Sequence, residues 1–370
     1  MAHFQTAFFN HLKKINNCLR NRRATANISL PGGVLQIQGQ NRVYDLQPQF
    51  IVSDAETGIL MRFQLDQTSN GFAGWLPYCN KRWLEAYSKN AFKEFVKRNG
   101  IRTPDHHITP TSCGDVVIKK DRSSFAVGMR GPFRETSPDV SQTCLSEGEY
   151  YEKFVFGRNL KAWFWNGSPV CVEIEEMAHV LGDGQRTVME LIAPKLEGIV
   201  RPVPNDLIKC MAEYQGKHLD SVLKEGEKLY VDYRYASPLC KGYRENRNIL
   251  QKLNASLRQQ LDVAGRTFEQ SIPAEIRPNT VFTADGIVDE QDRIWFLEIN
   301  CNPGLHPDVY PAMLESLFAD ADMIPDSCKP LHLQKSSHVP EAVAVALQNN
   351  PTAKPEQSLS AQALSQKQVR

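Results

Sequence analysis

The sequence TVFTADGIVDEQDRIWFLEINCNPG occupies residues 280–304 and reads as two strands joined by an acidic turn. Residues 280–288 and 293–299 are rich in β-branched and aromatic side chains, as strands are. Residues 289–292 between them contain three acids and one glutamine. The stretch therefore predicts a β-hairpin, and the sharp Asn-Pro-Gly turn that follows ends its second strand.

Three oxygen-bearing side chains lie on this hairpin. Asp285 is on the first strand, and Glu298 and Asn300 are two positions apart on the second, so they share one face. Pairing of the strands brings Asp285 toward Glu298. Carboxylate and amide oxygens suit Mg²⁺, which binds through few protein oxygens together with substrate phosphates. The alternative is an ordinary solvated hairpin, but apolar neighbours indicate a buried strand, where an unpaired Glu298 is costly.

A second candidate follows a β-branched run. Val116-Val117-Ile118 predicts a strand that ends at Lys119 and leads into a polar loop at 121–131. A lysine beside such a loop suits phosphate binding, because the ammonium supplies charge and loop amides and hydroxyls supply donors. A surface lysine at a strand end is the plainer interpretation. Neither a P-loop nor the dinucleotide motif G-x-G-x-x-G occurs in the chain.

The remaining periodicity predicts strands and helices in alternation. Strands are expected within 34–63 and at 150–155, 160–165 and, beyond the Asn166-Gly167 turn, 170–174. Helices are expected at 8–23, 81–98, 187–192, 246–263 and 310–318. Asp183 is positioned to cap the helix expected at 187–192. This order predicts an α+β chain whose sheets could clamp a ligand between them.

The composition narrows the classes of function. The 370 residues include 43 basic and 42 acidic side chains, so the net charge of +1 gives no support for binding nucleic acid or an anionic membrane. No run approaches 18 apolar residues, which excludes a transmembrane helix. Nine cysteines without a C-x-x-C pair argue against a disulfide framework and fit a reducing, cytoplasmic setting.

The two ends of the chain differ from its middle in amino-acid composition. The first acid is Asp45, and several basic residues precede it, so the opening is either a surface helix or a targeting segment. Gln, Ala, Ser, Lys and Pro dominate after residue 330, and aromatic residues are missing there. We therefore expect residues 331–370 to be a disordered tail.

The order and spacing of these motifs resemble the ATP-grasp carboxylate–amine ligases over residues 81–318. Lys89 falls where D-alanine–D-alanine ligases place their first phosphate-binding lysine, and Lys119 falls at the second. Residues 152–155 match the adenine hinge, and 172–192 look most like the ATP-grasp module of cyanophycin synthetases. Asp285, Glu298 and Asn300, followed by Pro303-Gly304, match the metal triad and the end of its strand.

The resemblance implies an α+β ATP-grasp fold, with a small N-terminal α/β subdomain at 1–85 and two α+β subdomains, 86–155 and 156–325, clamping ATP. It implies nucleotide contacts from Lys89, Lys119, Ser123, Ser124, Gly128, Glu152, Lys153, Val155 and Asn159. It also implies that Asp285, Glu298 and Asn300 hold two Mg²⁺ ions, with Mn²⁺ as a possible substitute.

The chain departs from the family at three places. Thr283 stands where D-alanine–D-alanine ligases carry an arginine that steadies the reacting oxyanion, and Arg234 or Arg244 is expected to replace it. Asn159 stands where an acid usually binds the ribose hydroxyls. The loop at 121–131 keeps Gly128 but lacks a further glycine.

The resemblance implies an ADP-forming ligase. A substrate carboxylate attacks the γ-phosphorus of ATP, and an amine then displaces phosphate from the acyl phosphate to form an amide. Amino acids or short peptides are the expected substrates, with neither nucleic acid nor membrane as a partner. Two alternatives stay open: modification of a polypeptide, as by tubulin tyrosine ligase-like enzymes, and ATP binding without turnover.

Overall fold

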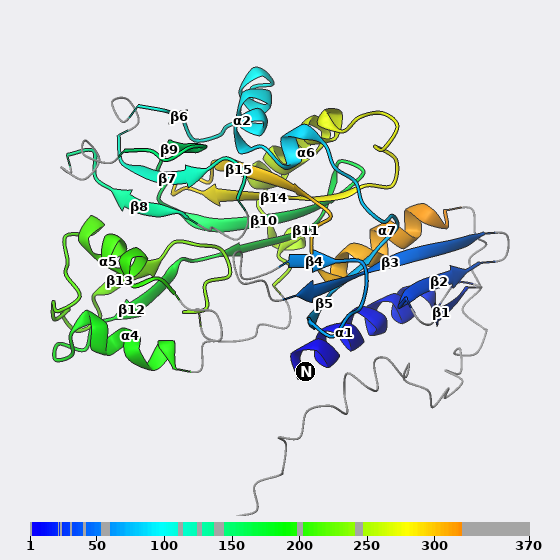
Figure 1. Cartoon of the computed structure of the whole chain (residues 1–370), viewed down its shortest axis with the longest axis horizontal. Coiled ribbons are helices and arrows are strands. Elements are labelled where there is room, and N and C mark those ends of the chain that lie inside the picture. Colours follow the sequence, from blue (N-terminus) through cyan, green and yellow to red (C-terminus); the bar gives the residue numbers. More distant parts are fainter. Residues whose placement is uncertain are drawn as a thin grey trace, which may run out of the picture.

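The computed structural model describes residues 2–319 apart from 21, 23, 30–31, 40–41, 53–59, 110–113, 124–127, 137–143, 198–202 and 241–246. The expected tail, Ser124 and Arg244 therefore lie outside the described residues. Within them, every strand pair is antiparallel, and helices cover the sheets, which confirms the α+β class (Figure 1). No helix of the described part is long and apolar enough to cross a bilayer.

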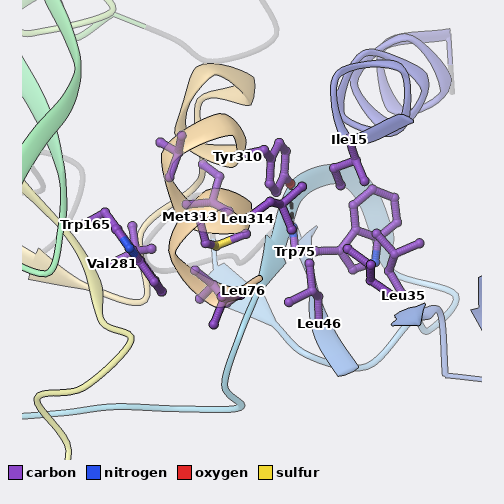
Figure 2. Packing of buried hydrophobic residues seen from close by; sticks show 14 of the residues in the cluster. Ile15, Leu35, Leu46, Trp75, Leu76, Trp165, Val281, Tyr310, Met313 and Leu314 are labelled. Atoms are coloured by element: carbon purple, nitrogen blue, oxygen red, sulfur yellow. Dashed lines mark hydrogen bonds between the residues drawn. The ribbon is translucent and has the colours of Figure 1, made fainter. Parts of the chain in front are cut away.

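The chain begins with helix α1 (Ala2–Leu19), which packs on a five-stranded sheet. Its strands are β1 (Thr25–Ser29), β2 (Val34–Gln38), β3 (Val43–Val52), β4 (Leu60–Arg62) and β5 (Ser69–Leu76). Helix α7 (Tyr310–Leu317), far away in the sequence, completes this core. Figure 2 shows Tyr310, Met313 and Leu314 of α7 packed toward Trp75 and Leu46, with Trp165 and Val281 on the other side of the helix. The last described helix thus closes the first core.

A second sheet has the order β6-β9-β7-β8. It consists of β6 (His106–His107), β7 (Val116–Lys120), β8 (Arg130–Phe133) and β9 (Glu149–Lys153), preceded by η1 (Leu84–Ala86) and α2 (Lys89–Arg98). The helix expected at 81–98 begins only at Lys89, because the Ser88 hydroxyl accepts a hydrogen bond from the amide of Ala91 and caps it there.

A third sheet has the order β11-β10-β14-β15. It consists of β10 (Arg158–Trp165), β11 (Ser168–Glu175), β14 (Val281–Val288) and β15 (Ile294–Cys301). Helix α6 (Ala255–Ser271) and η2 (Leu250–Lys252) share an apolar core with one face of this sheet, and η3 (Pro307–Val309) follows β15. The helix expected at 246–263 is wrong in its start, because Asn254 caps α6.

A small two-stranded sheet pairs β12 (Ala178–Leu181) with β13 (Lys228–Asp232), and α4 (Val188–Leu196) and α5 (Asn205–Tyr214) share its apolar core. The cap expected from Asp183 is wrong. Thr187 caps α4 through a capping box with Glu190, whereas Asp183 accepts hydrogen bonds from the amides of Gln185 and Arg186.

Gly265 marks the closest approach of α6 to the third sheet. A Cβ at this position would lie 2.2 Å from the carbonyl oxygen of Gly167 and 2.6 Å from the ring of Phe164. Gly265→Ala is therefore expected to lower the free energy of unfolding by about 1–3 kcal/mol through overpacking, as urea denaturation would measure. The neighbouring exposed substitution Arg266→Ala should change it by less than about 0.5 kcal/mol. Equal effects of the two variants would contradict the tight packing.

Candidate functional site

The third sheet has one apolar face and one polar face. Leu160, Ala162 and Phe164 point from β10 into the core shared with α6. The alternate residues face the other way, so Lys161 lies on the polar face, opposite Asp285 on β14. Glu173 on β11 and Glu298 on β15 continue the same cross-strand row. Four charged side chains from four strands therefore lie side by side.

A β-bulge places Glu298 in this row. Asp285 pairs with Glu298, but the next residue, Gly286, pairs with Phe296, so Leu297 is the extra residue of β15. The bulge lets Phe296 stay in the apolar core while Glu298 faces the polar side. The sequence predicts that Asp285 and Glu298 approach each other, and the structure brings them directly opposite.

Each acid of the expected metal triad is paired with a lysine, and one of them also accepts a hydrogen bond from Asn300. Asn300 Nδ2 donates to Asp285 Oδ2 over 3.0 Å, and Lys161 Nζ lies 2.7 Å from Asp285 Oδ1. Lys89 Nζ lies 3.0 Å from Glu298 Oε2. Asp285 and Asn300 are thus bonded to each other, whereas Glu298, opposite Asp285 in the strand pairing, is held by Lys89.

The pKa values of Asp285 and Glu298 are shifted in opposite directions. Burial raises the pKa of Asp285, and although Lys161 opposes the rise, the charge of Glu298 adds to it. Burial also acts to raise the pKa of Glu298, but Lys89, Lys119 and Lys161 outweigh it and lower that pKa. A metal ion bound between the two carboxylates would reduce the repulsion between their charges.

Lys89 connects Glu298, at the end of this cross-strand row, to the loop after β7. As the first residue of α2, it also donates to the carbonyl oxygen of Ser123 over 2.6 Å. Asp121 in the same loop accepts from the amide of Asn90 over 2.8 Å. The loop expected to cover phosphates is therefore tied to the N-terminus of α2 and, through Lys89, to Glu298.

A buried charge cluster lies on the second sheet. Lys119 Nζ is 2.6 Å from Glu152 Oε1, and Lys93 Nζ is 2.7 Å from Glu152 Oε2. The Lys93 side chain is 0% exposed and that of Glu152 2%. Burial acts to raise the pKa of Glu152, but the two ammonium groups lower it to about 2. Burial lowers the pKa of Lys93, and Glu152 opposes this change. Two lysines thus surround one carboxylate, and we call Lys93, Lys119 and Glu152 the positive cluster.

The residues expected to bind adenine lie at the end of β9. The amide of Lys153 donates to Asp105 O over 2.8 Å, and the amide of Phe154 donates to Asp115 O over 2.7 Å. Val155 lies beyond the β9 ladder. Binding of adenine by 152–155 stays a prediction, and of these residues Val155 has the backbone least involved in the sheet.

Arg234 is paired with Asp232 and not with Asp285 or Glu298. Its Nε donates to Asp232 Oδ1 over 2.9 Å and its Nη2 to Asp232 Oδ2 over 2.8 Å, a two-pronged pair at the end of β13. Lys161, which sequence reasoning did not single out, is the cation that touches Asp285. Lys161 falls on the strand predicted at 160–165, and the observed β10 also includes Asn159, two residues earlier and so on the same face.

Several buried polar atoms around the two sheets have no hydrogen-bond partner among the described residues. On the polar face of the third sheet these are Asn159 Nδ2 and Thr283 Oγ1, and on the second sheet Tyr150 Oη is another. Each such atom costs about 1–3 kcal/mol. A polar ligand between the sheets would give them partners.

The donor set fits a hard divalent cation. Asp285, Glu298 and Asn300 offer carboxylate and amide oxygens, the chemistry that Mg²⁺ prefers. Among the described residues, no group of three or more His, Cys, Asp or Glu side chains is arranged to hold a metal ion. The third ligand proposed for the present site, Asn300, is an amide. Lys89 and Lys161 hold the carboxylates, so an entering cation competes with both lysines.

No family model and no curated protein matches the sequence. Comparison with solved structures finds a bifunctional glutathione synthetase from Pasteurella multocida, 12% identical, with a TM-score of 0.38 over 80% of this chain and 41% of that one. It also finds a D-alanine–D-alanine ligase from Bacillus anthracis, 14% identical, with a TM-score of 0.35 over 63% of this chain and 66% of that one. The ATP-grasp ligase PsnB, solved with a minimal precursor, is 9% identical, with a TM-score of 0.30 over 62% and 60%.

The structures found by this comparison include the kinds of ligase that the sequence resembles. The chain spans 41% to 66% of the lengths of these three proteins. Because the identities and TM-scores are low, the chemistry of the site has to be inferred from this chain's own side chains.

Proposed function

We propose that the chain is an ATP-dependent, ADP-forming ligase that joins a carboxylate to an amine through an acyl phosphate. The observation that carries this proposal is the ion pair between Lys89 and Glu298. It joins the helix and loop expected to hold phosphates to the hairpin expected to hold the metal. ATP would lie between the second and third sheets, as expected for clamping subdomains at 86–155 and 156–325.

The charges of the two sheets suit the parts of MgATP. Asp285, Glu298 and Asn300 would hold Mg²⁺, which when bound neutralises phosphate oxygens. Lys89, at the start of α2, and Lys119, on β7, supply further positive charge. Phosphoryl transfer needs mainly positioning and charge stabilisation, and this arrangement offers both.

Lys161 is the side chain we propose in place of the missing arginine. Its ammonium lies 2.7 Å from Asp285 Oδ1, on the polar face and next to Thr283, which occupies the family's arginine position. In the liganded site Asp285 would help to hold the metal, and Lys161 would bind an oxyanion of the reacting substrate. Arg244 lies outside the described residues, and Arg234 is committed to Asp232.

The charged side chains on and near β11, on the same polar face, suit a substrate that carries both a positive and a negative charge. Glu173 accepts from Tyr235 Oη over 2.7 Å, and Arg247 bridges Glu173 and Glu175 at 3.4 and 3.0 Å. In addition to Asp285, this face therefore offers the carboxylates of Glu173 and Glu175 and the guanidinium of Arg247 as partners for a substrate. An amino acid or short peptide carries the ammonium and carboxylate that such partners bind.

The test is a screen for substrate-dependent ADP release. The protein is incubated with MgATP and pairs of amino acids or short peptides, ADP is measured, and the product is identified by mass. We expect ADP and an amide in equal amounts for at least one pair, and a hydroxamate when hydroxylamine replaces the amine. ATP binding without ADP formation across the panel would contradict the ligase and indicate a binding module.

A further inference from the structure

Tyr150 carries a buried hydroxyl group without a partner among the described residues. Its side chain is 2% exposed, and Oη makes no hydrogen bond within that part of the chain. Tyr150 lies opposite Lys119 on β7 and two residues before Glu152 on β9, so the three side chains share one face of the second sheet. This is the face that carries the positive cluster.

Three carboxylates act on the phenol from nearby. Burial raises the pKa of Tyr150 well above its usual value, and the charges of Glu152, Glu298 and Asp121 add to the rise. Two of these carboxylates belong to the second sheet and its loop, whereas Glu298 belongs to β15. Because its pKa is raised, the hydroxyl is a neutral donor.

The nearby carboxylates are already used as acceptors. Two lysines hold Glu152, and Lys89 holds Glu298. Asp121 accepts hydrogen bonds at the N-terminus of α2. The Tyr150 hydroxyl is a donor without an acceptor among the described residues, and leaving it unpaired is costly.

We propose that the Tyr150 hydroxyl donates a hydrogen bond to a phosphate oxygen of the bound nucleotide, in the space between Lys119 and Glu298. This inference rests on the proposed function, which places the phosphates there. A phosphate oxygen is an anionic acceptor, so the bond is charge-assisted and short. A neutral phenol adds direction to the site without adding charge beside the metal ligands.

The experiment compares wild type with Tyr150→Phe, which removes only the hydroxyl. Calorimetry with Mg²⁺ and the β,γ-imido analogue of ATP should show binding at least about tenfold weaker in the variant, the size expected for a hydrogen bond to a charged group. Adenosine, which lacks phosphates, should bind equally to both proteins. The Tm of the ligand-free variant should equal or exceed that of wild type, because an unpaired buried donor has been removed.

Tyr151→Phe is the matched control. Tyr151 lies on the opposite face of β9, where it packs with Val116 and Ile118 away from the positive cluster. This variant should bind the analogue as wild type does. Should Tyr150→Phe fail to fold, Tyr150→Met, which also lacks the hydroxyl, replaces it.

The outcomes separate this inference from the function on which it rests. Equal affinities of wild type and Tyr150→Phe for the analogue overturn the inference and leave the proposed function in place. A lower Tm with unchanged affinity gives Tyr150 a structural role and overturns it as well. Wild type that does not bind the analogue at all overturns the proposed function and, with it, this contact.

Discussion

Replacing Glu298 by glutamine is expected to lower substrate-dependent ADP formation by about 10²–10³-fold, the size typical of losing one electrostatic group in a reacting site. Glu298 is the carboxylate that the bulge of β15 turns toward Asp285, and it carries the ion pair with Lys89. Glutamine keeps the shape but removes the charge that would hold Mg²⁺. Steady-state ADP release under saturating MgATP measures the effect.

Glu290→Gln is the control for this experiment. It makes the same chemical change on the same hairpin, but Glu290 is exposed at the turn between β14 and β15. Its activity should equal that of wild type. Circular dichroism should show both variants folded. If Glu298→Gln turns over as fast as Glu290→Gln, the metal site is not where we place it.

Lys93→Met is expected to lower the free energy of unfolding by about 1–3 kcal/mol, because a buried carboxylate oxygen loses its donor while Lys119 still pairs with Glu152. Lys93 is fully buried and is bound to Glu152 and to the hydroxyl of Thr103. Methionine fills similar space but leaves Glu152 Oε2 without its counter-ion. Urea denaturation monitored by tryptophan fluorescence measures the change.

Lys97→Met, an exposed substitution on the same helix, should cost less than about 1 kcal/mol, since surface ion pairs contribute little. The double variant Lys93→Met/Glu152→Met should be less stable than Lys93→Met alone, because it also takes away the partner of Lys119, whose side chain is only 13% exposed. Equal losses in Lys93→Met and Lys97→Met would contradict the buried pair.

The same pair predicts a dependence of stability on pH. The pKa of Glu152 falls from 4.5 to about 2 on folding, so its contribution is fully present above pH 4.5 and is lost as the pH falls toward 2. Wild type should therefore lose stability over this interval. A variant that carries methionine at both Lys93 and Glu152 should lose less over the same range.

The hairpin and its three oxygen donors could be predicted because the signal is local. Strand parity fixes which residues share a face, and the turn between the strands is only a few residues long. Lys161 could not be assigned to Asp285 in the same way. Its strand, β10, pairs with β14, which begins more than 100 residues later, and no local pattern sets that register.

The helix expected at 246–263 is wrong in its start, because the Asn254 side chain caps α6 and the helix begins at Ala255. Helix α5 is outside the predicted elements, although Leu207 and Met211 have helical spacing and are buried in its core. The buried pair of Lys93 and Glu152 joins a helix to a strand, which spacing alone does not reveal.

The packing of α7 on the first sheet has a consequence for synthesis on the ribosome. Trp75, Leu46 and Leu35 emerge early, but the helix that covers them, with Tyr310 and Leu314, is made more than 200 residues later. The part of the molecule translated first is therefore among the last to be sealed. During that interval its exposed apolar surface is a target for chaperones and a risk for aggregation.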